Sequence, residues 1–212
     1  MTGGMVGSSF LSRVMVFIDG HYLEKVIDDK KWTDKGSVGL IYQNIPNFLV
    51  SQTQRGSVKP ELERAYYYNA LPNLKDLDNI KDQKERDNIE KKMKEIIQKN
   101  EPRFDAIRLL DMFDVRLGRL VYSKNGEPRQ KGVDSLIAID MLSKAFKKDY
   151  NEAVLVAGDS DFVEVVKAVK DAGVKVAGAF FKENTSKELI QSFDKQIVLD
   201  SYDFVKNNLL DS

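Results

Sequence analysis

The stretch RVMVFIDG, residues 13–20, decides the fold. It is a short apolar run rich in β-branched residues that ends in Asp19 and Gly, a pattern typical of a buried strand in a parallel sheet. A second run of this kind, EAVLVAGD, lies at residues 152–159 and ends in Asp159. A segment with helical periodicity follows each run, and strands that alternate with helices predict an α/β fold.

Other segments with strand or helix patterns extend this prediction along the chain. Strand patterns lie at residues 61–71, 114–123, 175–181 and 195–200. Helical patterns lie at residues 21–30, 40–54, 75–101, 134–148, 160–173, 186–193 and 201–210. We expect a three-layer αβα sandwich with a mainly parallel, Rossmann-like central sheet. The expected strand order is 3-2-1-4-5, with right-handed crossovers and the last short strand at one edge.

The domain organisation is predicted to be simple. Residues 1–12 are rich in Gly and Ser and are expected to form a flexible leader, while residues 13–212 are expected to form a single domain. The apolar phase of the third strand shifts across Gly118, which predicts a β-bulge or a bend there. The Asn-Gly pair at residues 125–126 predicts a hairpin turn after that strand.

The composition excludes several classes of site. The 212 residues include no cysteine and a single histidine, His21. Zinc fingers, iron–sulfur clusters and thiol nucleophiles are therefore excluded, and a Ser-His-Asp triad or a multi-histidine metal site is disfavoured. The 33 Lys and Arg residues balance the 33 Asp and Glu residues, so a basic surface for nucleic acid would have to be local.

The chain also lacks the sequence patterns of membrane and secreted proteins. No apolar run approaches the roughly 20 residues that cross a bilayer. The N-terminus has no basic flank before a long apolar stretch, which a secretory signal would need. We therefore expect a cytoplasmic protein with no membrane partner.

Carboxylates gather at the ends of the two strands that decide the fold. Asp19 closes the first strand, and Asp159 and Asp161 close the second. Asp134 opens the helix that leads to the second strand. If the two strands are neighbours, their ends lie only about 4.8 Å apart. Like charges at that spacing need a cation among them, and the motifs contain only Lys131, so these oxygen ligands predict a Mg²⁺ or Mn²⁺ site.

Each acidic motif also has an explanation without chemistry. Asp19, Asp134 and the pair Asp159 and Ser160 could each cap a helix, because Asp and Ser are favoured at helix N-termini. A cap is the commoner role for any one such motif. The argument for a functional site rests on all of them being placed at the same edge of the sheet.

The motifs VFIDG (16–20), KGVD (131–134) and GDSDF (158–162) occur together in this chain. Their combination resembles the NYN domain, a branch of the PIN-like nuclease superfamily, and the match is closest to its LabA-like members. The clear resemblance covers residues 13–24 and 131–182. The pair of KGVD and GDSDF is fairly specific, whereas VFIDG alone is weak.

The resemblance implies a metal-dependent ribonuclease with an acidic pocket and a PIN-like fold. The family's catalytic and metal-binding positions fall on Asp19, Asp134, Asp159 and Asp161, and supporting positions fall on Asp140 and Ser160. Such a site needs no histidine or cysteine. A divalent ion held by carboxylates would neutralise the scissile phosphate and lower the pKa of bound water.

One departure from the family pattern suggests an alternative function. Members commonly carry Asn two or three positions after the first Gly, whereas His21 and Tyr22 follow Gly20 here. A polar helper is thus missing or replaced by His21. The alternative is a catalytically weak or inactive NYN-type module that binds RNA or regulates.

Other acidic phosphate enzymes fit less well. An Asp-x-Asp at a strand end also occurs in Toprim-type sites, but these need a Glu after their first strand, where Asp19 stands. Haloacid-dehalogenase-type phosphatases need an Asp-x-Asp pair after the first strand, and here the second position is His21.

A basic segment runs directly into Asp134 and is the expected nucleic-acid contact. Its cations are Arg116, Arg119, Lys124, Arg129 and Lys131, against the single acid Glu127. Its only aromatic residue is Tyr122, so contact with the phosphate backbone is better supported than base stacking. A charged, solvated edge strand is the alternative. The residues alone are compatible with either RNA or DNA as the substrate, whereas the resemblance implies RNA. They are also compatible with a monomer or a homo-oligomer.

Overall fold

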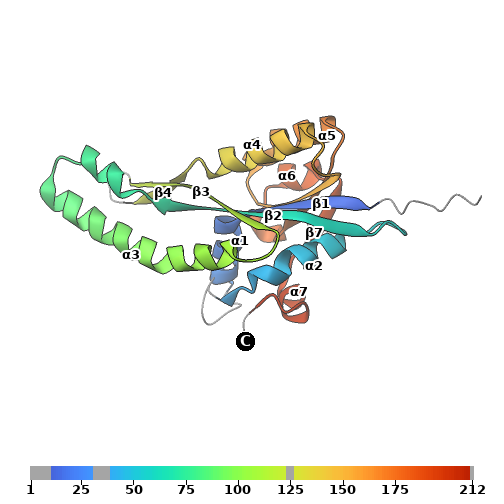
Figure 1. Cartoon of the computed structure of the whole chain (residues 1–212), viewed down its shortest axis with the longest axis horizontal. Helices are drawn as coiled ribbons and strands as arrows, with labels where there is room; N and C mark the ends of the chain where they lie inside the picture. The colour runs from blue at the N-terminus through green and yellow to red at the C-terminus, as the bar shows by residue number, and fades with distance from the viewer. Residues whose placement is uncertain (1–10, 31–38, 123–126, 211–212) are drawn as a thin grey trace, which may run out of the picture.

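A seven-stranded sheet forms the centre of the structure (Figure 1). The computed structural model describes residues 11–30, 39–122 and 127–210, so residues 1–10 of the expected leader and Lys124 lie outside these ranges. The strands are β1 (Ser12–Asp19), β2 (Pro60–Pro72), β3 (Phe113–Tyr122), β4 (Pro128–Lys131), β5 (Glu152–Val156), β6 (Lys175–Phe180) and β7 (Lys195–Val198). Their order across the sheet is β4-β3-β2-β1-β5-β6-β7.

The strand pairing confirms a mainly parallel sheet. Every neighbouring pair is parallel except β3 and β4, which are antiparallel. The six parallel strands stand in the expected order, with β7 at one edge. The order differs in detail because residues 128–131, for which no strand was expected, form β4 beyond β3. The expected turn residues at 125–126 lie outside the described ranges.

Helices cover both faces of the sheet, as an αβα sandwich requires. They are α1 (Gly20–Asp29), η2 (Tyr42–Asn44), α2 (Ile45–Gln52), η3 (Leu74–Asn79), α3 (Gln83–Arg108), α4 (Val133–Phe146), η4 (Ser160–Phe162), α5 (Val163–Asp171), η5 (Lys182–Asn184), α6 (Lys187–Ser192) and α7 (Ser201–Lys206). One core packs α1, α2, α3 and α7 against one face, and a second packs α4, α5 and α6 against the other (Figure 1). Val14, Val16 and Ile18 of β1 point into the first core. Met15 and Phe17 point into the second.

The charged segment between β2 and β3 differs from the single helix expected at 75–101. It forms η3 and then α3, because Asp82 accepts a hydrogen bond from the amide of Glu85 (2.7 Å) and so caps a new helix start. The helix also continues through Pro102 to Arg108. Among the helices of the described ranges, none is both long and apolar enough to cross a bilayer.

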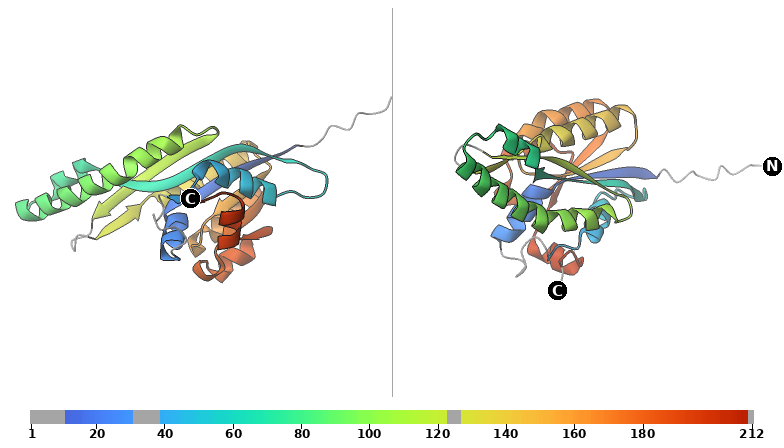
Figure 2. Two further views of the ribbon diagram at one scale, coloured as in Figure 1. Left: turned by 90° about the horizontal axis from the view of Figure 1, so that it is seen from below. Right: turned by 60° about the vertical axis from the view of Figure 1, so that its left-hand side comes forward.

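One end of the sheet extends well beyond β1. Asp19 is paired with Tyr68, which is paired with Arg116, and β3 then continues to Tyr122. At about 3.3 Å per residue this extension is roughly 20 Å long. Helix α3 packs along β2 and β3 (Figure 2). We call this extension the arm, and it comprises residues 72–97, 117–122 and 127–131.

Gly118 marks a close approach of two segments, and of the bulge or bend expected there the strand pairing excludes the bulge. The register between β2 and β3 is unbroken along their paired length. A Cβ atom at Gly118 would lie 2.8 Å from the carbonyl oxygen of Lys131 and 2.8 Å from a methyl group of Val133. The glycine is needed because the chain entering α4 passes directly over β3. The register shift in the sheet lies between Val14 and Met15 instead.

A buried carboxylate connects α1 to three other elements. The Oε1 atom of Glu24 accepts hydrogen bonds from the hydroxyl groups of Tyr42 (2.9 Å) and Tyr67. The same oxygen lies 3.1 Å from Nη1 of Arg103 on α3, and Nδ2 of Asn69 lies 3.5 Å from Oε2. Burial raises the pKa of Glu24, and the charge of Arg103 opposes this shift. Elements α1, η2, β2 and α3 therefore meet at one charged group.

We expect Glu24→Ala to destabilise the protein strongly. Removing one partner of a buried ion pair leaves the other charge uncompensated, at a cost of about 3–5 kcal/mol. The free energy of unfolding in urea measures the loss. Glu24→Gln keeps the volume and should lose less. The control is Glu90→Ala, which removes a surface pair with Lys94 on α3 and should change stability little. Equal losses for Glu24→Ala and Glu90→Ala would contradict a central role for the buried group.

Candidate active site

Two of the predicted aspartates follow neighbouring strands. Ile18 of β1 is paired with Val156 of β5, which confirms the strand adjacency on which the predicted site depends. Asp19 is the last residue of β1, and Asp159 lies just after the end of β5. Since neighbouring strands lie about 4.8 Å apart and these two are parallel, both carboxylates stand at the same edge of the sheet.

Asp19 and Asp159 both cap the helical segments that follow them. Oδ1 of Asp19 accepts a hydrogen bond from the amide of Tyr22 (3.1 Å). Oδ1 of Asp159 accepts one from the amide of Asp161 (3.0 Å), and the Ser160 hydroxyl lies 3.4 Å from the same oxygen. The capping role is therefore real for both aspartates. Each cap uses one oxygen of a carboxylate that has two, so capping does not preclude a ligand on the other oxygen.

Asp134 does not act as a cap. The N-cap of α4 is Gly132, whose φ of +87° lies in the left-handed region that favours glycine, and it makes no side-chain capping hydrogen bond. Asp134 lies in the first turn of α4 with its side chain exposed. A carboxylate at this position is stabilised in its charged form by the helix dipole.

The electrostatics link these aspartates to one another. Burial raises the pKa of Asp19 to about 6, and the charge of Asp134 adds to the shift, while the nearby His21 opposes it. Burial also raises the pKa of Asp134, and the negative charges of Asp159 and Asp161 raise it further. These aspartates are therefore close enough to repel, and a cation among them would relieve that repulsion.

The chemistry of the donors fits a hard divalent cation. All four side chains offer carboxylate oxygens, the ligands that Mg²⁺ and Mn²⁺ prefer. Within residues 11–30, 39–122 and 127–210, no three His, Cys, Asp or Glu side chains stand close enough together to enclose an ion. Mg²⁺ usually binds through one or two carboxylates and keeps several waters. The arrangement therefore fits an ion held partly through water rather than in a closed cage.

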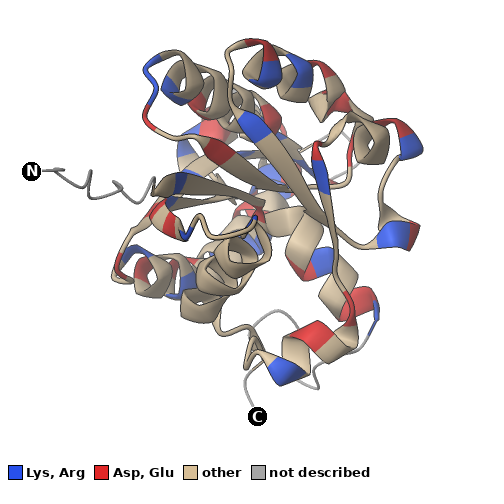
Figure 3. Cartoon of the chain, turned by 90° about the vertical axis from the view of Figure 1, so that its right-hand side faces the viewer, with Lys and Arg blue, Asp and Glu red and all other residues tan. Residues whose placement is uncertain are grey.

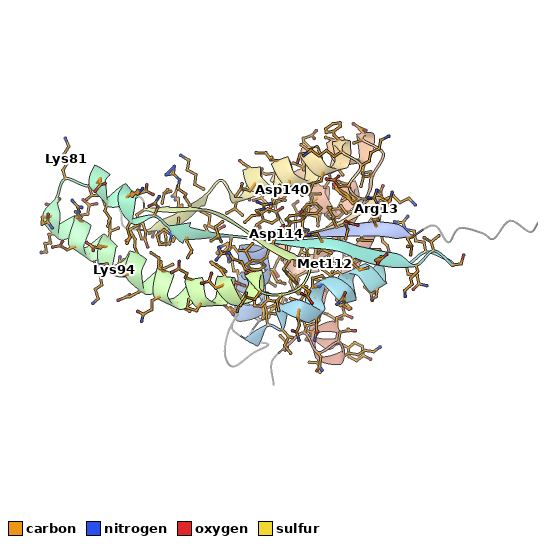
Figure 4. All side chains as sticks on the ribbon, viewed as in Figure 1. Arg13, Lys81, Lys94, Met112, Asp114 and Asp140 are labelled. Carbon is orange, nitrogen blue, oxygen red and sulfur yellow. The ribbon has the colours of Figure 1, made fainter. Side chains whose placement is uncertain are left out.

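Asp140 lies between α4 and the sheet (Figure 4). Its carboxylate accepts a hydrogen bond from the Tyr68 hydroxyl (2.9 Å) and pairs with Lys144 (2.9 Å). Nε of Arg116 lies 3.7 Å away, and both cations lie over the ring of Tyr66. These contacts join α4 to β2 and β3. They give Asp140 a packing role, and a supporting role at the metal site stays a prediction.

The other described cations of the basic segment lie on the β3–β4 hairpin. Arg119 and Lys131 are paired across the antiparallel ladder, and Arg129 is exposed on β4. Among the described residues Lys131 has no carboxylate partner, and it stands three positions before Asp134. Viewed from the opposite end of the sheet, basic and acidic residues are interspersed over the outer helices (Figure 3). The basic character is thus a local property of the hairpin.

Tyr22 stands in the region where the family pattern carries Asn. Its hydroxyl accepts a hydrogen bond from the amide of Phe181 (2.9 Å) and lies 2.8 Å from Oγ1 of Thr185. Because Thr185 donates its own proton to the carbonyl of Phe181, Tyr22 donates to Thr185. The Tyr22 ring lies so close to Gly158 that a Cβ atom there would overlap it. Tyr22 therefore positions Asp19, through its amide, relative to the loops after β5 and β6.

Sequence reasoning missed Glu24 and Tyr22 as supports of this region. A signal for Glu24 was present, since it lies beside the buried Leu23 and Ile27 on α1. The Tyr run at 66–68 was a second signal, because tyrosine hydroxyl groups in a buried strand need hydrogen-bond partners. For Tyr22 the sequence alone carried no such signal, since its partners lie far away in the chain.

Asp19→Asn is expected to stabilise the metal-free protein at neutral pH. The folded-state pKa of about 6 exceeds the ordinary value of 3.8, so the folded protein binds a proton that the unfolded chain releases. The resulting stability is present below about pH 4 and is lost as the pH rises through about 6. An Asn can keep the cap without the charge, so the variant should gain about 1–3 kcal/mol at neutral pH in EDTA.

Urea unfolding at several pH values, with the exposed Asp171→Asn as control, measures this difference. The gain should shrink toward acidic pH, and Mn²⁺ should stabilise the wild-type protein more than the variant. A variant that is less stable than the wild type at neutral pH would mean that Asp19 serves chiefly as a cap.

Comparison with known proteins places the chain in a family. The family model described as "NYN domain" matches residues 13–200. An uncharacterized protein of Sinorhizobium fredii, y4oD, is 40% identical over 72 residues, which is 34% of this chain and 33% of that protein. The match thus spans about a third of that relative's length.

A solved structure supports the fold. The crystal structure of a protein of unknown function, VPA0982 from Vibrio parahaemolyticus, aligns with a TM-score of 0.59 at 19% identity. The alignment covers 92% of this chain and 97% of that one. At this level of identity the likeness concerns the fold alone. With the NYN model matching nearly the whole described chain, from β1 to the end of β7, the protein belongs to the NYN domain family.

Proposed function

We propose that the protein is a metal-dependent nuclease that hydrolyses phosphodiester bonds in single-stranded RNA. The family has a nuclease-like fold, and the proposal rests on one observation in this chain. Asp19, Asp134, Asp159 and Asp161 gather at one edge of the sheet, where burial first and neighbouring negative charges second raise the pKa of Asp19 and of Asp134. Carboxylates that are partly buried beside one another without a balancing cation are typical of sites that bind a metal ion.

The four aspartates have different proposed roles at the metal ion. Asp19 and Asp159 hold a Mg²⁺ or Mn²⁺ ion from the ends of neighbouring strands, and Asp134 and Asp161 complete the acidic pocket. A bound divalent cation supplies charge neutralisation at the phosphate and activation of water. Ser160 supports the Asp159 carboxylate through the same oxygen that caps η4.

The substrate backbone must be held against this acidic edge by cations. Lys131 is suited to this task because it has no carboxylate partner in the described chain and lies three residues before Asp134. Arg119 and Arg129 flank it on the β3–β4 hairpin. Phosphate contacts of this kind position a strand without reading its sequence.

Two observations favour the second candidate, an NYN-type module that binds RNA but cleaves it weakly or not at all. No closed ligand cage stands among the described residues. In the segment where relatives carry Asn, this chain has Tyr22. Its hydroxyl group is hydrogen-bonded to Thr185 and to the amide of Phe181. We further propose that residues 13–212 work as one LabA-like domain in the cytoplasm.

Cleavage should require Mn²⁺ or Mg²⁺ and the acidic pocket. Purified protein is incubated with labelled single-stranded RNA or DNA in Mn²⁺, Mg²⁺ or EDTA, and products are resolved by electrophoresis. Asp159→Asn should lower the rate on the order of 100-fold or more, as loss of a positioned catalytic group does. Asp171→Asn, at the exposed end of α5, should leave it unchanged. RNA that is bound but never cleaved in either metal would support the binding module instead.

Charge reversal on the hairpin should weaken RNA binding for every sequence. Arg129→Glu or Lys131→Glu should lower affinity and reduce the slope of log affinity against log salt by about one. Fluorescence anisotropy in EDTA at several salt concentrations measures both quantities. Lys147→Glu, at the exposed end of α4, is the control. If all three variants keep the wild-type slope, the hairpin charges only solvate an edge strand.

A further inference from the structure

The end of β1 leaves one edge of β2 without a neighbouring strand. Asp19, the last residue of β1, is paired with Tyr68, whereas β2 continues to Pro72. Asn69 is therefore the first residue of β2 beyond this end, and only 7% of it is exposed. A buried amide group must be hydrogen-bonded, because it has lost its hydration. The partners of Asn69 accordingly show what the acidic edge is connected to.

A chain of hydrogen bonds with a defined direction passes through Asn69. Its Oδ1 atom accepts from the backbone amide of Ala70 (2.8 Å), which can only donate, and this fixes the orientation of the side-chain amide. Nδ2 of Asn69 then donates to the hydroxyl oxygen of Tyr67 (3.2 Å), whose own proton goes to Glu24. At the other end, Nε2 of Gln130 donates to Oδ1 of Asn69 (3.3 Å). Every donor thus points toward the Glu24 carboxylate, whose charge polarises the chain of hydrogen bonds.

These hydrogen bonds lie between the acidic edge and the basic hairpin. A Cβ atom at Gly20, the residue that follows Asp19, would lie 2.5 Å from the Tyr67 hydroxyl oxygen, so this hydroxyl group is in contact with the start of α1. Gln130 belongs to β4 and directly precedes Lys131. The hydrogen-bonded side chains therefore connect the helix that Asp19 caps to the strand that carries Lys131.

The basic hairpin needs a support of this kind. β4 has four residues and lies at the edge of the sheet, so its ladder is formed with β3 alone. β2 ends at Pro72, which is paired with Leu120, so beyond this pair β3 and β4 form a two-stranded ribbon. Such a ribbon is only marginally stable by itself in water. The hydrogen bond between Gln130 and Asn69 gives β4 a second attachment, because it joins β4 to β2 across β3.

We propose that Asn69 and Gln130 are positioning residues, whose hydrogen bond holds Lys131 at the acidic edge, where it binds the backbone of the RNA substrate. Neither Asn69 nor Gln130 contacts the RNA itself. This assignment rests on the proposed function for the identity of the bound chain. The hydrogen bond acts already in the free protein, so its effect on the hairpin needs neither metal nor cleavage.

Gln130→Met tests this role by RNA binding in EDTA, separately from catalysis. Methionine keeps the length of the side chain and adds no charge, but it cannot donate a hydrogen bond to Asn69. Affinity for labelled single-stranded RNA should fall about fivefold, the effect expected when one hydrogen bond is lost. The slope of log affinity against log salt should stay as in the wild type, because all the cations of the hairpin remain.

Two controls separate positioning from general stability. Gln196→Met removes a hydrogen bond to the Ile190 carbonyl (3.2 Å) on β7, the opposite edge strand, and should bind RNA as the wild type does. Tyr150→Phe removes a buried hydrogen bond to the Met141 carbonyl (2.8 Å) and should lower stability to urea without changing RNA affinity. If Gln130→Met binds RNA as tightly as Gln196→Met, the proposal fails. It also fails if Gln130→Met and Tyr150→Phe both lose affinity in proportion to their losses of stability.

Amide hydrogen exchange gives a readout that needs no RNA. In Gln130→Met the amides of β4 should exchange about fivefold faster than in the wild type, because one attachment that opposes local opening is lost. The amides of β7 should exchange as in the wild type. Unchanged exchange in β4 would overturn the proposal. If β4 exchanges faster but the protein binds no RNA, the hydrogen bond does position the hairpin and the proposed RNA function fails.

Discussion

The carboxylate of Glu24 lies inside the core between α1 and the sheet. A charged group is stable in such surroundings only when hydrogen bonds and an opposite charge reach it, since its hydration has been removed. Tyr42, Tyr67 and Arg103 meet this requirement from three separate elements. If any one of these elements moved away, the buried carboxylate would lose a hydrogen bond or its opposite charge. Because Asp19 caps the start of the same helix, the constraint extends to the acidic edge.

The same constraint sets where the arm lies. Arg103 belongs to the C-terminal half of α3, where Phe104 and Ile107 are buried in the main core. The N-terminal half of α3 packs in the arm through Ile89 and Met93. One continuous helix therefore connects the core under α1 to the far end of the extended strands (Figure 2). The arm and the acidic edge belong to one framework for this reason.

The sequence predicts the fold wherever local pattern and topology rules suffice. The apolar runs ending at Asp19 and Asp159 specify two buried parallel strands, and their adjacency follows from the order typical of such sheets. The start of α3 was missed, since one helix was expected over residues 75–101, although Asp82 followed three positions later by Glu85 is a helix-start signal. By contrast, the role of Gly118 depends on Lys131 passing over it, a contact between distant segments that periodicity does not encode.

The candidate site likewise has features that the sequence predicts and features that it does not. Residue type and strand ends place the carboxylates of Asp19, Asp134 and Asp159 at one edge. Side-chain packing across elements decides which oxygen of an aspartate caps a helix. The same packing turns Asp140 toward Tyr68 and Lys144. Pattern reasoning finds positions on a backbone, whereas the partners of a polar side chain are decided by the whole tertiary structure.

The close packing around Gly158 constrains how this sequence can evolve. A Cβ atom at position 158 would lie 2.4 Å from the ring of Tyr22 and 2.5 Å from the backbone carbonyl oxygen of Asn184, so a side chain and the main chain both require glycine there. A smaller residue at position 22 would remove only the first of these two contacts. Substitution at position 22 therefore does not open position 158 to other residues, because the loop after β6 still passes over it. Homologues should keep glycine at the position of Gly158 whichever residue stands at the position of Tyr22.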